Sequence, residues 1–374
     1  MPAYLRRIPI KGASTTMTTL AEPSTIVAAA PYPADPTARS VRKLRHRSRS
    51  IRLPADARLR HVAGPGPGDP ECPVDAVPLR ETDPVRVNGY RLVSRLGTGG
   101  MADVFYAVAP TGRPVAVKVL RPVDGPQTCH REYRLAHAVD ADCTAAALGH
   151  GTSTAGAYLV TAYLPGYRRG TTLMGRPTPV GALWTLGSEL ARMLAGIHAK
   201  GIVHCDVKPS NLLVRGHDLR VIDFGIARYV GEPPVDDGTV QCTRGWAAPE
   251  QLHAAPATPA IDVFAWGCLL AHLASGVHPF ASQSDEEWIL RIQSAQPDLI
   301  DLPSDLEDLI RWTLARNPRD RPSARELVRI CQAGPALSAR RSSQRGGLAA
   351  SPTLGSRGTG QPSETTRMPR FVTR

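Results

Sequence analysis

The residues with the clearest chemical meaning lie in one short stretch, His204-Cys205-Asp206-Val207-Lys208-Pro209-Ser210-Asn211. Asp206 offers a carboxylate that can accept a proton from a hydroxyl group. Lys208 offers a cation that can offset the charge of a moving phosphoryl group, and Asn211 offers an amide oxygen that can hold a metal ion. This combination predicts phosphoryl transfer to a hydroxyl, although the stretch by itself is also compatible with a solvated polar turn.

Four more motifs flank this stretch, and their order along the chain excludes a chance match. They are Gly97-Thr98-Gly99-Gly100-Met101-Ala102-Asp103-Val104 and Val115-Ala116-Val117-Lys118 before it, and Asp223-Phe224-Gly225 and Ala248-Pro249-Glu250 after it. With all five motifs in this order, the chain resembles the eukaryotic-like serine/threonine protein kinases of bacteria. The resemblance covers roughly residues 88–333, which is about two-thirds of the chain.

The resemblance implies roles for the charged residues of these motifs. Asp206 would be the base that orients the substrate hydroxyl, and Lys208 would contact the transferring phosphoryl group. Lys118 would bind the nucleotide phosphates and pair with a helix carboxylate, for which Glu132 is the candidate, although Glu132 is also compatible with an ordinary exposed helix position. Two further residues would hold Mg²⁺, with Mn²⁺ as a substitute, and these are Asn211 and Asp223.

The resemblance also implies an ATP site between a glycine-rich hairpin and a hinge segment. Glycines allow the backbone of the hairpin to approach phosphates closely, and the third glycine of the general pattern is replaced by Ala102. Thr161 falls at the gatekeeper position, and the backbone of the next two residues would bond the adenine, within a register error of one residue. The nucleotide-binding residues expected are Leu96, Gly97, Gly99, Gly100, Val104, Ala116, Lys118, Thr161, Ala162 and Tyr163.

Local patterns indicate the elements that must position these groups. Residues 90–96 and 114–120 read as strands, and the helical face at 180–200 carries Leu183, Leu186, Leu190, Leu194 and Ile197. Ser323 and Glu326 predict a capping box at the last helix. With the resemblance, these patterns predict an α+β, bilobal protein-kinase fold. A small β-rich N-lobe would span 88–163 and a large helical C-lobe 164–333.

Other residues receive structural roles from the resemblance. His204 would pack against Phe224, Glu250 would pair with Arg321, and Asp262 would anchor the backbone of the catalytic loop. Thr243 would touch Asp206 and Lys208.

The family's arginine after the histidine is replaced by Cys205. That arginine normally pairs with a phosphorylated residue of the activation segment, which a thiol cannot do. We therefore expect activity that does not depend on phosphorylation of Thr239 through this contact. A negatively charged neighbour, Asp206, disfavours the thiolate, so we expect a passive thiol.

The basic character of the chain lies outside this region. The formal net charge is +12 for 374 residues, but basic residues exceed acidic ones by 5 in 1–85, by 1 in 86–333 and by 6 in 334–374. Composition predicts that 1–87 and 334–374 are disordered. Residues 39–60 are strongly basic and carry three interspersed serines. They are either a solvated linker or a tether to an acidic partner, anionic lipid or nucleic acid.

Nucleic acid is not expected, because the basic segment lacks aromatic residues for base stacking and the centre of the chain is nearly neutral. The partners expected are protein substrates with serine or threonine acceptors. Seven scattered cysteines without a Cys-x-x-Cys pair indicate free thiols in a reducing compartment. No apolar run is long enough to span a membrane and no secretory signal is recognisable, so the location expected is cytoplasmic.

Three rival interpretations were considered. A pseudokinase acting as a binding module would have lost Lys118, Asp206, Asn211 or Asp223, and all four are present. A small-molecule phosphotransferase is disfavoured by Lys208 and by the Ala-Pro-Glu motif. A nucleic-acid-binding protein would explain only the tails.

Overall fold

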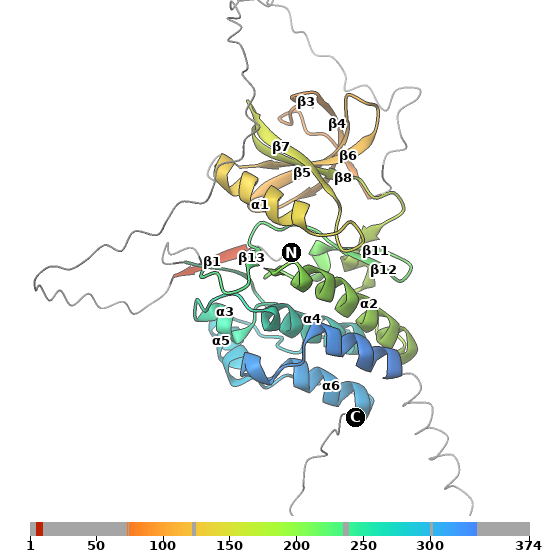
Figure 1. Ribbon diagram of the computed structural model, residues 1–374, viewed down its shortest axis with the longest axis vertical. Coiled ribbons are helices and arrows are strands. Elements are labelled where there is room, and N and C mark those ends of the chain that lie inside the picture. The colour runs from red at the N-terminus through yellow and green to blue at the C-terminus, as the bar shows by residue number, and fades with distance from the viewer. Residues whose placement is uncertain are drawn as a thin grey trace, which may run out of the picture.

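The computed structural model describes residues 5–9, 73, 75–121, 125–234, 239–299 and 302–334. Figure 1 shows a β-sheet with one helix at one end of the molecule and a larger helical part at the other. The basic segment 39–60 and the tail 335–374 lie outside the described residues, so the disorder predicted for them stays a prediction.

One antiparallel sheet forms the N-lobe, with strand order β2-β4-β5-β6-β8-β7 and with β3 paired to β4. Its strands are β2 (Val77–Pro78), β3 (Arg86–Val87), β4 (Tyr90–Thr98), β5 (Ala102–Val108), β6 (Pro114–Leu120), β7 (Ala147–Ser153) and β8 (Gly156–Ala162). In β6, Val115 and Val117 are buried on one face. Since side chains alternate along a strand, Ala116 and Lys118 point to the opposite face, which lines the cleft.

The sheet extends further toward the N-terminus than the sequence indicated. We expected the folded region to begin at residue 88, but β2 and β3 already pair with β4. A buried ion pair holds this extension, because Arg95 donates from Nε and Nη2 to Asp83 at 2.6 and 2.5 Å. Residues that precede the expected start therefore contribute two short strands to this sheet. The disorder predicted for this segment was inferred from its composition, and composition does not reveal an ion pair between residues that are not adjacent in sequence.

Helix α1 (Pro126–Ala138) packs against β7 and β8 and carries Glu132 on its buried side. Gly125 precedes it in an extended conformation and Pro126 occupies its first turn, where the missing N–H has no intrahelical partner to lose.

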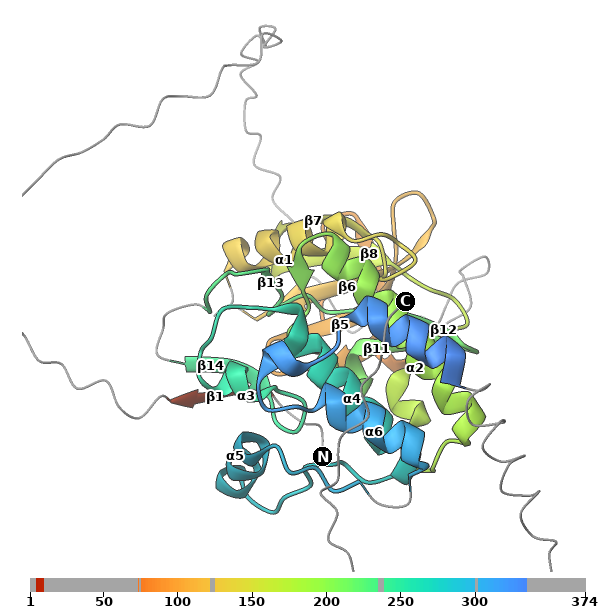
Figure 2. The same cartoon turned by 60° about the horizontal axis from the view of Figure 1, so that its bottom comes forward.

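The C-lobe is helical, and α2, α4 and α6 lie together in it (Figure 2). Its helices are α2 (Val180–Ala199), α3 (Pro249–Leu252), α4 (Pro259–Ser275), α5 (Asp285–Ser294), α6 (Ser304–Thr313) and a last helix over 324–334. The five apolar residues predicted on one face of α2 are all buried. Glu326 N–H donates to Ser323 Oγ at 3.3 Å and Ser323 N–H to Glu326 Oε2 at 2.7 Å, which confirms the predicted capping box.

Short strands and 3₁₀ turns connect the lobes and shape the cleft. Strands β9 (Arg168–Arg169), β11 (Leu212–Arg215) and β12 (Asp218–Val221) form a small sheet in the order β12-β11-β9. Two further pairs are β10 (Ile202–Val203) with β13 (Arg228–Tyr229), and β1 (Leu5–Pro9) with β14 (Thr239–Thr243), which lie side by side in Figure 2. The 3₁₀ turns are η1 (Gly170–Leu173), η2 (Pro209–Asn211) and η3 (Pro318–Asp320).

Candidate active site

The buried carboxylate of Asp262 in α4 holds the backbone of the loop between β10 and β11. Its two oxygens accept the backbone N–H groups of His204 and Cys205, both at 2.9 Å. Burial would raise the pKa of Asp262, but His198, His204 and these N–H groups outweigh it and hold the pKa below its usual value. Asp262 therefore fixes the loop backbone, as the resemblance implied.

His204 packs its ring edge-on against Phe224, with centroids 4.9 Å apart. Its Nε2 lies 3.2 Å from the Ile222 carbonyl, and Nδ1 accepts the N–H of Asp206 at 3.3 Å. Because burial lowers the pKa of His204, the ring is neutral near pH 7. These contacts give His204 the structural role expected from the sequence.

Asp206 lies at the centre of a buried cluster of charge-assisted hydrogen bonds. Lys208 Nζ donates to Asp206 Oδ2 at 2.7 Å and to Thr243 Oγ1 at 2.6 Å, and Thr243 Oγ1 donates to Asp206 Oδ1 at 2.6 Å. Asn211 Nδ2 donates to the Asp206 carbonyl and to Oδ2 at 3.0 and 2.9 Å. The carboxylate is thus fixed in direction and its charge is matched by one cation.

Lys118 joins the two lobes across the cleft. Its Nζ lies 2.7 and 2.9 Å from the Glu132 carboxylate oxygens and 2.8 Å from Asp223 Oδ1. Burial would lower the pKa of Lys118, but the two carboxylates outweigh it and raise the pKa. Burial likewise would raise the pKa of Asp223, and Lys118 outweighs it so that Asp223 stays ionised. Glu132 is buried and paired, which excludes the exposed position considered for it.

Asn211 and Asp223 are spaced by the hairpin of β11 and β12, which follows Asn211 and precedes Asp223. The Ile222 N–H donates to the Asn211 carbonyl at 2.8 Å and closes this hairpin. Amide and carboxylate oxygens are hard ligands, and Mg²⁺ typically takes one or two such protein ligands together with phosphate oxygens and water. The donor set therefore fits Mg²⁺. Among the described residues, no group of three or more His, Cys, Asp or Glu forms a metal site by itself.

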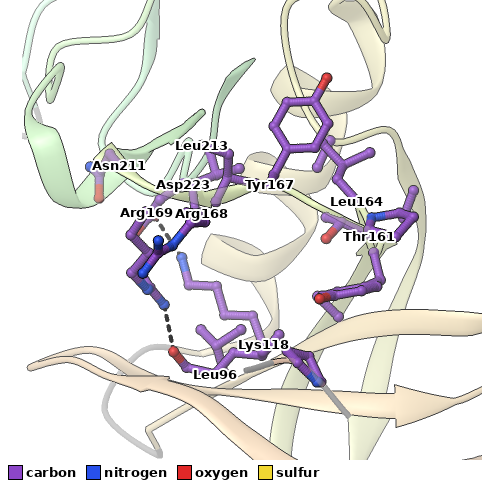
Figure 3. Close-up of a pocket in the computed structure, with 18 of the residues that line it drawn as sticks. Leu96, Lys118, Thr161, Leu164, Tyr167, Arg168, Arg169, Asn211, Leu213 and Asp223 are labelled. Carbon is purple, nitrogen blue, oxygen red and sulfur yellow. Dashed lines mark hydrogen bonds and ion pairs between the residues drawn. The ribbon is translucent and has the colours of Figure 1, made fainter. Parts of the chain in front are cut away.

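A cavity of about 590 Å³ lies between the sheet and the small β9-β11-β12 sheet (Figure 3). Most of the expected nucleotide and metal residues line it: Leu96, Val104, Ala116, Lys118, Glu132, Thr161, Ala162, Tyr163, Asn211 and Asp223. The expected residues Gly97, at the end of β4, and Gly99 and Gly100, in the turn from β4 to β5, are not among the lining residues. Asp206 and Lys208 also do not line the cavity.

Sequence reasoning missed part of the cavity wall. Pro73 and Asp75 reach it from the N-terminal extension, and Arg168 and Arg169 reach it from β9. The approach of Pro73 and Asp75 depends on the pairing of β2 with β4, which had no local signal.

The activation segment is tied to the C-lobe at its far end. Arg321 donates to both oxygens of Glu250 at 2.6 and 2.9 Å, and the arginine side chain is fully buried. Gln251 Nε2 donates to the Cys205 carbonyl at 2.9 Å. The expected Glu250–Arg321 pair is therefore present, and Gln251, the residue after Glu250, connects the activation segment to the catalytic loop.

Cys205 adopts a left-handed backbone with φ of +64° and is buried. Burial, together with Asp262, raises the pKa of its thiol to about 12. The other five cysteines of the described part are also buried and free, and Cys72 lies outside it. Within the described part, no helix has the length and apolar character needed to cross a membrane.

Comparison with known proteins gives the same assignment as the motifs. The family described as "Protein kinase domain" matches residues 90–330. The chain is 40% identical over 259 residues to the probable serine/threonine-protein kinase PkwA of Thermomonospora curvata, across 67% of this chain and 35% of PkwA. It is 34% identical over 257 residues to the serine/threonine-protein kinase AfsK of Streptomyces coelicolor, across 67% of this chain and 32% of AfsK.

A third relative is the serine/threonine-protein kinase PknA of Mycobacterium tuberculosis, which is 35% identical over 246 residues, across 61% of this chain and 57% of PknA. The chain thus spans about a third of the length of PkwA and AfsK and somewhat more than half of PknA.

Proposed function

Because this chain belongs to the protein kinase family, we propose that it transfers the γ-phosphoryl group of ATP to serine and threonine hydroxyls of proteins, including its own. The observation that carries the proposal is the bonding of one carboxylate, Asp206, by Lys208, Asn211 and Thr243 at once. Lysine two residues after the aspartate is typical of serine/threonine kinases. The names of the relatives support the same acceptor class.

In this reaction the Asp206 carboxylate accepts the proton of the acceptor hydroxyl and orients its oxygen. Lys208, bound to the same carboxylate, places a cation where charge develops on the transferring group. Lys118, held by Glu132, binds the nucleotide phosphates from the other lobe. Asn211 and Asp223 would hold Mg²⁺, or Mn²⁺ in its place, and the bound ion would neutralise phosphate charge.

The decisive test is transfer of labelled γ-phosphate from Mg·ATP to the purified full-length protein and to a generic protein substrate. We expect label on serine or threonine with the wild type and about 10³-fold less or none with Asp206→Asn, which keeps the shape but not the base. Folding of the variant is checked by its thermal unfolding. A folded wild type that labels neither itself nor the substrate would favour the pseudokinase interpretation.

We also propose a cytoplasmic location for the protein. The proposal is supported by the six cysteines of the described part, which are all free thiols, whereas disulfides form and persist in proteins of oxidising compartments. Fractionation of cells that express the full-length chain tests it, and recovery from a membrane or extracellular fraction would contradict it.

A further inference from the structure

Arg169 sends its side chain from β9 into the cavity, toward the strand that leads into the glycine-rich turn (Figure 3). Its Nη2 donates to the Leu96 carbonyl of β4 at 2.8 Å, and its Nη1 donates to the Ser210 carbonyl of the catalytic loop at 3.2 Å. The guanidinium thus bridges the N-lobe and the catalytic loop. It also lies directly under Gly97, where an added Cβ would come within 2.5 Å of Nη2.

The partners of Arg169 are neutral. In the part of the chain that the structure describes, Arg169 forms no ion pair with a carboxylate, whereas Lys118 on the opposite wall has two. Asp223 and Asp75 act on Arg169 only over a longer range, and burial lowers the pKa of its guanidinium. Carbonyl oxygens satisfy hydrogen bonds but do not neutralise a half-buried charge, which is costly without an anion.

The neighbouring arginine differs in this respect. Arg168 has a side chain that is 65% exposed, and its nearest carboxylate is that of Asp75, at 3.8 Å. Both arginines line the cavity, but water can solvate the exposed Arg168 side chain, whereas Arg169 is half-buried there. The proposed ligand of this cavity carries several negative charges. A guanidinium has five N–H donors in a planar fork, and two of them suffice for a bidentate contact to a phosphate.

We propose that Arg169 is a phosphate-binding residue of this cavity, which supplies the polyphosphate of a nucleoside di- or triphosphate with a further cation besides Lys118 and Lys208. The inference rests on the proposed function for the identity of the ligand class. On this proposal, Arg169 contributes to binding of the phosphate groups and not to binding of the nucleoside. The contact to Leu96 then places this cation beside the glycine-rich turn.

The test compares the binding of ADP and of adenosine to the full-length protein by calorimetry, with Mg²⁺ present throughout. We expect Arg169→Gln, which keeps amide hydrogen-bonding but loses the charge, to weaken ADP binding by about tenfold or more. Adenosine binding should change by less than about twofold, because the nucleoside carries no phosphate. Arg134→Gln, which removes an exposed charge of α1, is the matched control and should leave both affinities unchanged.

Three results would overturn the proposal. Equal weakening of ADP binding and adenosine binding would indicate a ribose contact or a structural role for Arg169. Unchanged ADP binding would show that the charge is not used, and tighter ADP binding would show that the arginine competes with the nucleotide. Arg169→Lys gives a second criterion if the glutamine variant does not fold. It keeps the charge and should bind ADP within about threefold of the wild type, and a tenfold loss would also overturn the proposal. Failure of the proposed function is distinct, because the wild type would then transfer no phosphate.

Discussion

Thr243 Oγ1 lies 2.6 Å from Asp206 Oδ1, although 37 residues separate the two in sequence. The hydroxyl also accepts a hydrogen bond from Lys208 Nζ at 2.6 Å, so strand β14 of the activation segment is joined directly to the proposed base and its cation. The position of this strand therefore affects the geometry of Asp206.

Removal of the Thr243 hydroxyl should impair phosphoryl transfer more than folding. Since hydrogen bonds to charged groups contribute about 1.5–3 kcal/mol each, we expect Thr243→Val to lower the rate on a generic protein substrate by about 10- to 100-fold. Thr243→Ser keeps the hydroxyl and should retain activity within about threefold. Steady-state rates of both purified variants check this, and a valine variant as active as the wild type would show that the contact is not needed.

Activity should not require phosphorylation of Thr239. Cys205 cannot bind a phosphate as an arginine would, and its loop is already held by Asp262 and Gln251 through backbone groups. We expect Thr239→Ala to keep its rate within about threefold of the wild type, because position 205 has no guanidinium that could bind a phosphate on Thr239. Rates are compared after phosphatase treatment of both proteins. Loss of activity in a folded Thr239→Ala variant would contradict this expectation.

The buried cysteines should make stability fall at high pH. Burial raises the pKa of Cys205, Cys242 and Cys331 to about 12, and that of Cys129 and Cys143 to about 11. Unfolded thiols titrate near about 8.5, so above that pH the unfolded chain holds fewer protons than the native chain and the free energy of unfolding falls. The stabilisation that comes from the protonated buried thiols is complete below the unfolded pKa, and it is lost as the pH rises through the folded pKa values.

Urea unfolding at pH 7, 9 and 10 measures this loss. In the same pH range, iodoacetamide should not alkylate the six buried cysteines of the native protein, but it should alkylate all of them in denaturant, as mass spectrometry can show. Rapid alkylation of Cys205 in the native protein at pH 8 would contradict both its burial and its raised pKa.

The pair of Arg321 and Glu250 should be important for folding of the C-lobe. Arg321 also donates to the carbonyls of Ala315, Ala260 and Arg316 at 2.8, 2.9 and 3.3 Å. Its removal therefore leaves the buried Glu250 carboxylate without its cation and removes three hydrogen bonds to backbone carbonyls. We expect Arg321→Met to lower the free energy of unfolding by about 3–5 kcal/mol. Glu250→Gln keeps an acceptor and should cost less, about 1–3 kcal/mol. Equal losses in urea unfolding would show that the backbone contacts of Arg321 contribute little.

The local elements of this chain were predictable because their signals are local. The period of Leu183, Leu186, Leu190, Leu194 and Ile197 identifies a helix wherever it packs, and all five are buried in α2. Likewise, alternation along β6 places Lys118 on the face opposite Val117. The two short strands before residue 88 were not predicted, because the ion pair of Asp83 and Arg95 that holds them has no such period.

The sequence by itself determined which groups are present and how far apart they lie within one loop, as for Asp206, Lys208 and Asn211. Only the tertiary structure decided which further charged groups meet. It brought Asp223 of the other lobe to Lys118 beside the expected Glu132, brought Asp75 to the cavity, and left Arg169 with neutral carbonyls. The physical reason is that short spacings are fixed by covalent geometry, whereas the pairing of distant charges depends on the burial and packing of the whole fold.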